Sequence, residues 1–303
     1  MKKFHFARRA AAVFLSLAAA GCGGSATRSG TSSGDSAATA ADTGHPRMEA
    51  LWVTDTTLRA PESALWDSAR NLFFVSDIHG DGAAKDGNGF ISQVGPDGRI
   101  IRLKWVTGLD APKGLARVGD TLYAADLDSV VAIDIPAARI ISKTYVPGAT
   151  FLNDAATDPE GNLYVSDTRQ GKVFRYRDGR VSLVWGPPEM KGANGLLWWK
   201  DKLWILTSDG IYSYTGAPGA RPVLFSDAVK NGDGIARVND TDLICSRWAG
   251  EIYYVRGDGS ARKLLDTRGS HANTADISYL PLDSLVIVPT FNGNTVEAYK
   301  LIP

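Results

Sequence analysis

The sequence predicts an all-β fold, a six-bladed β-propeller whose ring is closed by an N-terminal strand. Three observations support this prediction. A unit of short strands recurs six times in the 303 residues, for example as PESALWDSARNLFFVSD, LNDAATDPEGNLYVSD and ADISYLPLDSLVIVPT. Successive units are 39 to 51 residues apart, which is the length of one propeller blade. Alternating apolar residues between Gly, Asn and Asp turns are typical of strands, and helical periodicity is almost absent.

The first 22 residues are typical of an export signal. A basic start is followed by an apolar run over residues 10–20 and then by Gly21 and Cys22. The run is shorter than the roughly 20 residues that a membrane-spanning helix needs. The cysteine after small residues resembles the lipobox of bacterial lipoproteins, which implies cleavage before Cys22 and lipidation of its thiol. The alternative is an ordinary signal peptide that leaves Cys22 free. The expected location is therefore outside the cytoplasm, on a membrane. In a Gram-negative bacterium this means the periplasm or the outer membrane.

Residues 23–46 are rich in Ser, Thr, Gly and Ala, which predicts a flexible tether rather than a packed element. Residues 47–303 form the predicted propeller. The long first interval contains a Gly-rich insertion, IHGDGAAKDGNG, before Phe90.

The end of the repeat predicts how the ring closes. The last unit ends in NTVEAYKLIP, which supplies only a third strand, while the strand EALWVTD at residues 49–55 precedes the first unit and has no local partner. Pairing the two would remove an exposed edge. A solenoid or a β-sandwich is the alternative, but neither explains a polar residue that recurs in all six units.

Charge and cysteine content exclude several functions. The chain has 33 basic and 33 acidic residues, with no basic run beyond the signal, so a nucleic acid is not an expected partner. The second cysteine, Cys245, lies in the apolar stretch DLICSRW and is expected to be a buried core residue.

Each unit opens with a polar residue, and these residues are Glu62, Lys113, Asn153, Asn194, Asp233 and Asp276. Because the inner strand of every blade lines the central channel, the six side chains are expected to converge. Converging carboxylates repel one another and lose solvation, so positive charge is expected among them. Lys113 supplies one charge, most simply in an ion pair with Asp276. A bound cation would supply the rest, and oxygen ligands favour a hard metal such as Ca²⁺ or Mg²⁺.

These residues resemble the regucalcin/gluconolactonase family of six-bladed propellers, also called the senescence marker protein family, and more distantly the paraoxonases. In those proteins a Glu, two Asn and an Asp surround one divalent metal. The matching residues in blade order are Glu62, Asn153, Asn194 and Asp233. The resemblance implies that they hold Ca²⁺, or alternatively Mg²⁺, Zn²⁺ or Mn²⁺. Asn153 would ligate as in paraoxonases or face the substrate as in gluconolactonases. Asp233, or a water that it orients, would be the catalytic base or nucleophile.

Further side chains are expected on the substrate side of this site, namely Lys113, Asp154, Asp276, His79 and Trp248. Gluconolactonase-like proteins often carry Arg two residues before the Asn of the ND motif, where it contacts a sugar. Here that position is Phe151, which argues against a polyhydroxylated sugar lactone. Only His79 and His271 lie in the predicted propeller, so a three-histidine zinc site is excluded.

The sequence therefore predicts a gluconolactonase-like, metal-dependent hydrolase of a lactone or related small ester. Two alternatives remain open. One is a non-catalytic, surface-anchored propeller that binds a ligand or a partner protein, and the other is a metal-dependent lyase that acts on a cyclic substrate.

Overall fold

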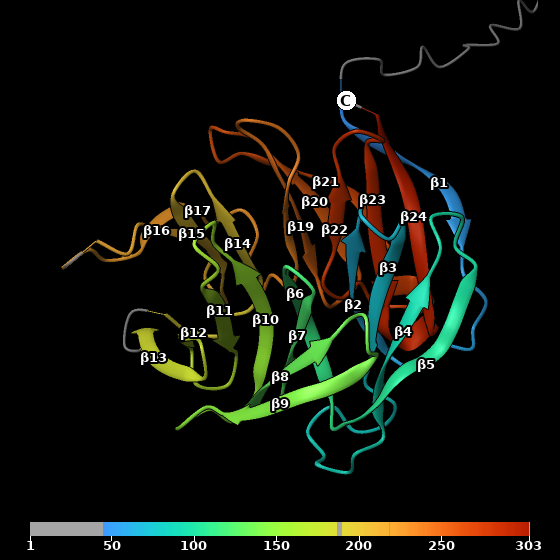
Figure 1. Ribbon diagram of the computed structural model, residues 1–303. Helices are drawn as coiled ribbons and strands as arrows, with labels where there is room; N and C mark the ends of the chain where they lie inside the picture. Colours follow the sequence, from blue (N-terminus) through green and yellow to red (C-terminus); the bar gives the residue numbers. More distant parts are fainter. Residues whose placement is uncertain (1–44, 187–189, 218, 303) are drawn as a thin grey trace, which may run out of the picture. The chain divides into compact units, whose positions relative to one another are not determined.

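The computed structural model describes residues 45–186, 190–217 and 219–302. The predicted signal, Cys22 and the tether up to residue 44 lie outside the described residues. These described residues form one compact unit. It consists of six four-stranded antiparallel sheets, which confirms the six-bladed propeller (Figure 1).

The first three blades follow the chain in order from the inner to the outer strand. Blade 1 comprises β2 (Pro61–Asp67), β3 (Leu72–Asp77), β4 (Gly89–Val94) and β5 (Ile100–Leu109). Blade 2 comprises β6 (Pro112–Val118), β7 (Thr121–Asp126), β8 (Ser129–Asp134) and β9 (Arg139–Tyr145). Blade 3 comprises β10 (Leu152–Thr157), β11 (Leu163–Asp167), β12 (Lys172–Arg177) and β13 (Arg180–Trp185).

Blades 4 and 5 repeat this order, and blade 6 takes its outer strand from the start of the domain. Blade 4 comprises β14 (Leu196–Trp199), β15 (Lys202–Leu206), β16 (Ile211–Tyr214) and β17 (Val223–Ser226). Blade 5 comprises β18 (Ile235–Arg237), β19 (Leu243–Arg247), β20 (Glu251–Val255) and β21 (Ala261–Asp266). Blade 6 comprises β22 (Ser278–Leu280), β23 (Leu285–Thr290), β24 (Thr295–Ile302) and β1 (Arg47–Val53).

The ring closes as the sequence predicts. Strand β1 pairs antiparallel with β24, from Arg47 opposite Ile302 to Val53 opposite Glu297. The strand covers residues 47–53 rather than the expected 49–55, because its pairing with β24 extends as far as Ile302.

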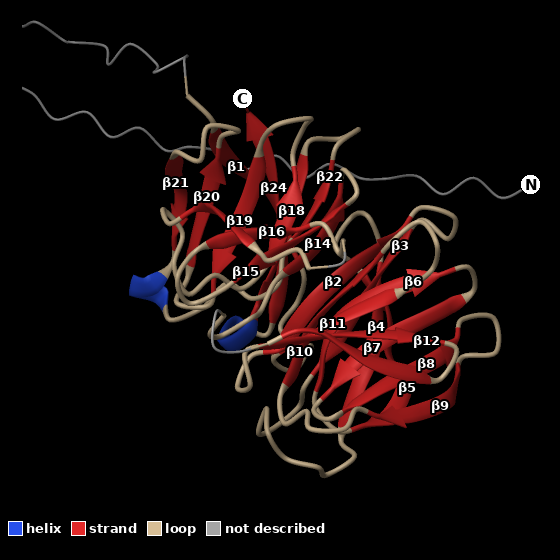
Figure 2. Cartoon of the chain, turned by 90° about the vertical axis from the view of Figure 1, so that its left-hand side faces the viewer, coloured by secondary structure: helices blue, strands red, loops and turns tan. Residues whose placement is uncertain are grey.

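Helices are nearly absent from the described residues, where the only two are 3-10 turns, η1 (Arg268–Ser270) and η2 (Phe291–Gly293) (Figure 2). No described helix is long and apolar enough to cross a bilayer.

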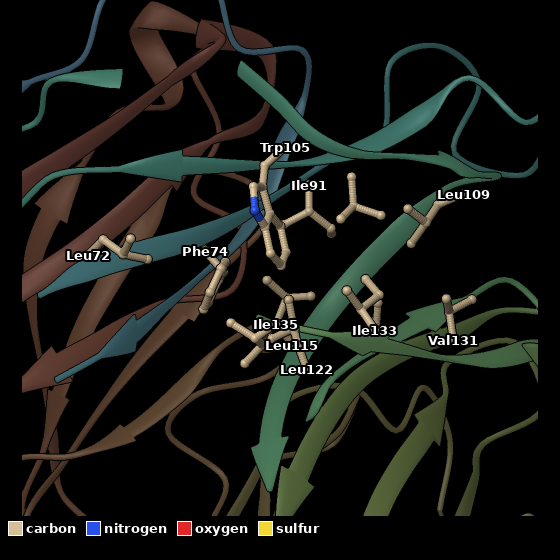
Figure 3. Close-up of a cluster of buried hydrophobic side chains, with 12 residues drawn as sticks. Leu72, Phe74, Ile91, Trp105, Leu109, Leu115, Leu122, Val131, Ile133 and Ile135 are labelled. Carbon is tan, nitrogen blue, oxygen red and sulfur yellow. The ribbon is translucent and has the colours of Figure 1, made fainter. Parts of the chain in front are cut away.

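Apolar side chains fill the spaces between neighbouring blades. Between blades 1 and 2, the rings of Phe74 and Trp105 lie 4.9 Å apart and pack with Leu115, Leu122 and Ile133 (Figure 3). Such packing fixes each blade against the next and so fixes the inner strands around the channel.

Carboxylates at the ends of the second strands hold the loops that lead into the inner strands. Asp77, Asp126 and Asp167 end β3, β7 and β11. They accept backbone N–H bonds of 2.6–2.7 Å from Arg59, Ala111 and Thr150, respectively. These bonds fix the end of the channel at which the inner strands begin.

Candidate active site

The inner strands carry a β-bulge where the predicted site residues lie. In blades 1 and 3 the pairing with the second strand shifts between Pro61 and Ala64 and between Leu152 and Ala155. Blade 2 shifts at the same place. Each bulge holds two consecutive residues, such as Glu62 and Ser63. A bulge re-aims side chains and is common beside active sites.

Blades 4 and 5 form the same bulge by hydrogen bonds. The N–H of Asn194 donates to Leu206 O (2.9 Å), and the N–H of Leu206 donates to Gly195 O (2.8 Å). Asp233 and Gly234 bond to Ser246 in the same way, at 2.8 and 2.9 Å. One residue of the second strand therefore faces two residues of the inner strand.

In blade 6 the equivalent of Asp233 is Ala275, because its N–H donates to Pro289 O (3.0 Å). The prediction that Asp276 opens this unit is therefore wrong by one residue. Asp276 occupies the second position of the bulge, together with Asp154 and Gly234. The error arose because either bulge position can carry a polar residue, as Asn153 and Asp154 do in blade 3, so composition does not distinguish the two positions.

A cavity of about 260 Å³ brings together the five other predicted polar residues, Glu62, Lys113, Asn153, Asn194 and Asp233. Glu62, Lys113 and Asp233 are 3–5% exposed, which is unusual for charged side chains. The amide Nδ2 of Asn194 donates to Asp233 Oδ1 at 2.6 Å. Five blades thus contribute one polar group each to a single site.

Three oxygens in this cavity have no hydrogen-bond partner. They are Glu62 Oε2, Asn194 Oδ1 and Asp233 Oδ2, and all three are inaccessible to solvent. A buried polar atom left unpaired costs about 1–3 kcal/mol, and most such atoms in folded proteins have a partner. A cation among them would remove this cost.

The donor set fits a hard divalent cation. The described residues contain no cluster of three or more His, Cys, Asp or Glu side chains that could hold a metal. The cavity instead offers two carboxylates and two amides, all of them oxygen donors suited to Ca²⁺ or Mg²⁺.

Burial perturbs the charged groups of the cavity. Loss of solvation, followed by repulsion from Asp233 and Asp276, raises the pKa of Glu62 well above its usual range. Loss of solvation and the nearby Asp276 raise the pKa of Asp233 to about 7. Burial lowers the pKa of Lys113 to about 8, although the charge of Glu62 opposes this shift. Ionisable groups whose pKa values are strongly shifted in a cavity are typical of functional sites.

Lys113 is bound to the backbone rather than to Asp276. Its Nζ donates to Gly82 O and to Ala111 O, both at 3.0 Å, and lies 4.4 Å from the centre of the Phe151 ring. Because Gly82 lies in the Gly-rich insertion, Lys113 attaches this loop to blade 2. The expected ion pair between Lys113 and Asp276 is therefore not formed by these two described residues.

Asp154 and Asp276 line a second cavity, of about 440 Å³, farther along the inner strands. Asp154 accepts a hydrogen bond of 2.5 Å from the N–H of Leu196 in blade 4. Asp276 accepts one of 2.8 Å from the Ser63 hydroxyl in blade 1. Both carboxylates link one blade to the next. The structure thus does not bring these two predicted substrate residues into the first cavity.

The two histidines of the propeller do not line the first cavity. His79 is half-buried, and its Nδ1 lies 3.3 Å from Asn88 O in the insertion. His271 is exposed after η1. Trp248 does line the cavity, as predicted, and its side chain is 48% exposed.

Sequence reasoning missed the other apolar lining residues, above all Ile78 and Phe291. Ile78 follows β3, Trp248 follows β19 and Phe291 follows β23, so all three occupy the same place after a second strand. This recurrence is visible in the repeat and could have identified them.

Comparisons with known proteins relate this chain to others by structure. No family model matches it, and no curated protein matches its sequence. The fold matches a streptogramin B lyase structure with a TM-score of 0.61 and 11% identity, over 84% of this chain and 98% of that chain. Selenomethionine-substituted virginiamycin B lyase from Staphylococcus aureus matches with a TM-score of 0.61 and 13% identity, over 85% of this chain and 100% of that chain.

A catalytically inactive variant of the same lyase, with quinupristin, matches with a TM-score of 0.59 and 12% identity, over 85% of this chain and 100% of that chain. At this level of identity the likeness establishes the fold. The resemblance to the regucalcin/gluconolactonase family stays a prediction. The chain is thus a six-bladed propeller whose structural neighbours include streptogramin B lyases.

Proposed function

We propose that the chain is a metal-dependent hydrolase of a lactone or related small ester. One observation carries this proposal: Glu62, Asn194 and Asp233 line one cavity, and each has a buried oxygen without a hydrogen-bond partner. No hydrogen bond from the described residues pairs these oxygens, and burial raises the pKa values of the two carboxyl groups, Glu62 and Asp233. Such a site favours a cation.

Glu62, Asn153, Asn194 and Asp233 would hold the metal. When bound, a divalent cation supplies Lewis acidity that polarises a carbonyl oxygen. The residues of the chain then have separate tasks. Asn194 fixes one oxygen of Asp233 through the 2.6 Å hydrogen bond, so its other oxygen has a defined direction. The other oxygen of the Asp233 carboxylate would act as the general base that accepts a proton from a water.

The test combines metal content with activity. Elemental analysis of the purified protein is expected to find one divalent metal per chain, and EDTA is expected to lower the melting temperature. A panel of lactones and aryl esters is expected to be hydrolysed with Ca²⁺, Mg²⁺, Zn²⁺ or Mn²⁺, and Asp233→Asn is expected to lower kcat/KM by about 100-fold or more. A metal-free protein without esterase activity would instead support a non-catalytic propeller that binds a ligand or a partner.

A lyase is the second candidate, since the structural neighbours include streptogramin B lyases. One of those lyases is inactivated by replacement of a histidine with alanine. No histidine of the described residues lines the first cavity here, which favours hydrolysis. Mass spectrometry distinguishes the two, because a hydrolysis product gains the mass of water and a lyase product does not.

A further inference from the structure

The first cavity has an apolar wall. Phe151, Trp248, Phe291 and Ile78 line it, and the Trp248 and Phe291 rings meet edge to face with their centres 5.9 Å apart. Trp248 is half-exposed, so an entering molecule can contact its ring. Such a wall favours an apolar substrate body over a polyhydroxylated one.

An exposed guanidinium adjoins this wall. The Cζ atom of Arg169 lies 4.2 Å from the centre of the Phe151 ring, in cation–π contact. The preceding residue fixes its position, because the N–H of Thr168 donates to Phe151 O (3.1 Å) and Thr168 Oγ1 donates to Ala193 O (3.0 Å). Arg169 is therefore held beside the Phe151 ring, which lines the cavity, by its own ring contact and by the hydrogen bonds of Thr168.

Arg169 has no hydrogen bond and no ion pair with the described residues of the chain, whereas Lys113, which contacts the same ring, donates to two backbone carbonyls. The free guanidinium has several N–H donors and a geometry that matches a carboxylate. The guanidinium can therefore bind a ligand group beside the Phe151 ring, whereas the Lys113 ammonium already donates to Gly82 O and Ala111 O.

We infer that the preferred substrate is an amphipathic ester or lactone, with an apolar body against Phe151 and Trp248 and a distal carboxylate bound by Arg169. This inference rests on the proposed function. It makes Arg169 a specificity-determining residue, since an anionic group elsewhere in the cavity would meet the carboxylates of Glu62 and Asp233.

The activity test uses two 4-nitrophenyl esters of equal acyl length, the glutarate monoester and the pentanoate. The wild-type protein is expected to prefer the anionic glutarate ester. Arg169→Gln is expected to lower kcat/KM for this ester by about tenfold, the size of one charge-assisted hydrogen bond, with little change for pentanoate. Arg139→Gln, at an exposed site on β9, is the matched control and is expected to change neither rate.

A binding test does not depend on catalysis. Calorimetry is expected to show that 4-phenylbutyrate binds the wild-type protein more tightly than 4-phenylbutanamide does, and that Arg169→Gln removes the difference. Equal binding of the acid and the amide by the wild-type protein would overturn the inference, whether or not the esters react. If both esters are hydrolysed without preference, the inference fails while the proposed function stands. If neither ester reacts but the acid binds through Arg169, the proposed function fails alone.

Discussion

At the scale of single residues, the site places negative charge where water cannot reach it. Glu62 and Asp233 are nearly fully buried, and each keeps one oxygen unpaired. Two carboxylates in such a place are costly unless they are protonated or a cation is bound. This cost predicts that the stability of the protein depends on pH, and the proposed metal site predicts that it depends on metal as well.

The pKa of Asp233 predicts the direction of this dependence. In the folded, metal-free protein it is raised from 3.8 to about 7, so folding favours the protonated form. The contribution to stability is therefore complete below about pH 4 and is lost as pH rises through about 7. Asp233→Asn is expected to remove this loss and to raise the free energy of unfolding at pH 8 by about 1–3 kcal/mol.

Urea unfolding in EDTA from pH 4 to pH 8 measures this effect. The wild-type and Asp233→Asn curves are expected to agree at the acidic end and to separate toward pH 8, and Ca²⁺ is expected to stabilise only the wild-type protein at pH 8. Parallel curves over the whole range would contradict the pKa assignment.

At the scale of elements, the bulge explains what the sequence could and could not predict. The strand pattern, the turns and the recurring polar residue predicted six blades and, in five of them, the first residue of the bulge, which lines the cavity. In blade 6 the sequence indicated Asp276 instead of Ala275. The reason is that side chains do not alternate between the two faces of the sheet inside a bulge, so the pattern does not distinguish two adjacent residues there. The backbone bond to Pro289 identifies the correct residue, and only the structure provides it.

Glycine at the second bulge position lets neighbouring blades approach each other. A Cβ atom on Gly195 would lie 2.2 Å from the backbone oxygen of Asp233. Because this oxygen belongs to the backbone, a change of side-chain rotamer could not relieve the clash. Gly195→Ala is expected to push blade 5 away, to lower the free energy of unfolding by about 1–3 kcal/mol and to weaken metal binding. Thermal unfolding and calorimetric titration with Ca²⁺ measure both effects. Gly269→Ala, where a Cβ atom has open space, is the control.

The Gly-rich insertion depends on Lys113 for its attachment to blade 2. Lys113→Met keeps the length of the side chain but removes the bonds to Gly82 O and Ala111 O. The insertion is expected to open more often, so that trypsin cuts after Lys85 at least roughly threefold faster. Limited proteolysis with mass spectrometry measures this rate. Lys104→Met, which removes only a contact of 5.1 Å with the Phe90 ring, is expected to leave it unchanged.

At the scale of the whole molecule, β1 completes the ring. The sequence predicted this closure because the last unit lacked a strand and the first strand lacked a partner. The apolar lining of the cavity could not be predicted in the same way, because Phe151 of blade 3 and Phe291 of blade 6 pack with Ile78 of blade 1 only after these blades have been placed around one axis.

Deletion of residues 47–53 is expected to expose the edge of β24. The melting temperature is expected to fall by more than about 5 °C, and the protein is expected to aggregate through the open edge. Differential scanning calorimetry and light scattering measure these changes. Deletion of residues 23–44, which precede β1, is the control and is expected to change neither.

The alanine of blade 6 has a consequence for redesign. Five positions of the ring carry a polar or charged side chain, and Ala275 contributes only a methyl group, so the proposed metal site lacks a ligand from blade 6. An acidic side chain placed there would add negative charge at the level of Glu62 and Asp233, and affinity for Ca²⁺ generally rises with the number of charged ligands. The same change would repel an anionic substrate. A single substitution in the sixth repeat is therefore expected to weaken the proposed hydrolase activity and to strengthen calcium binding.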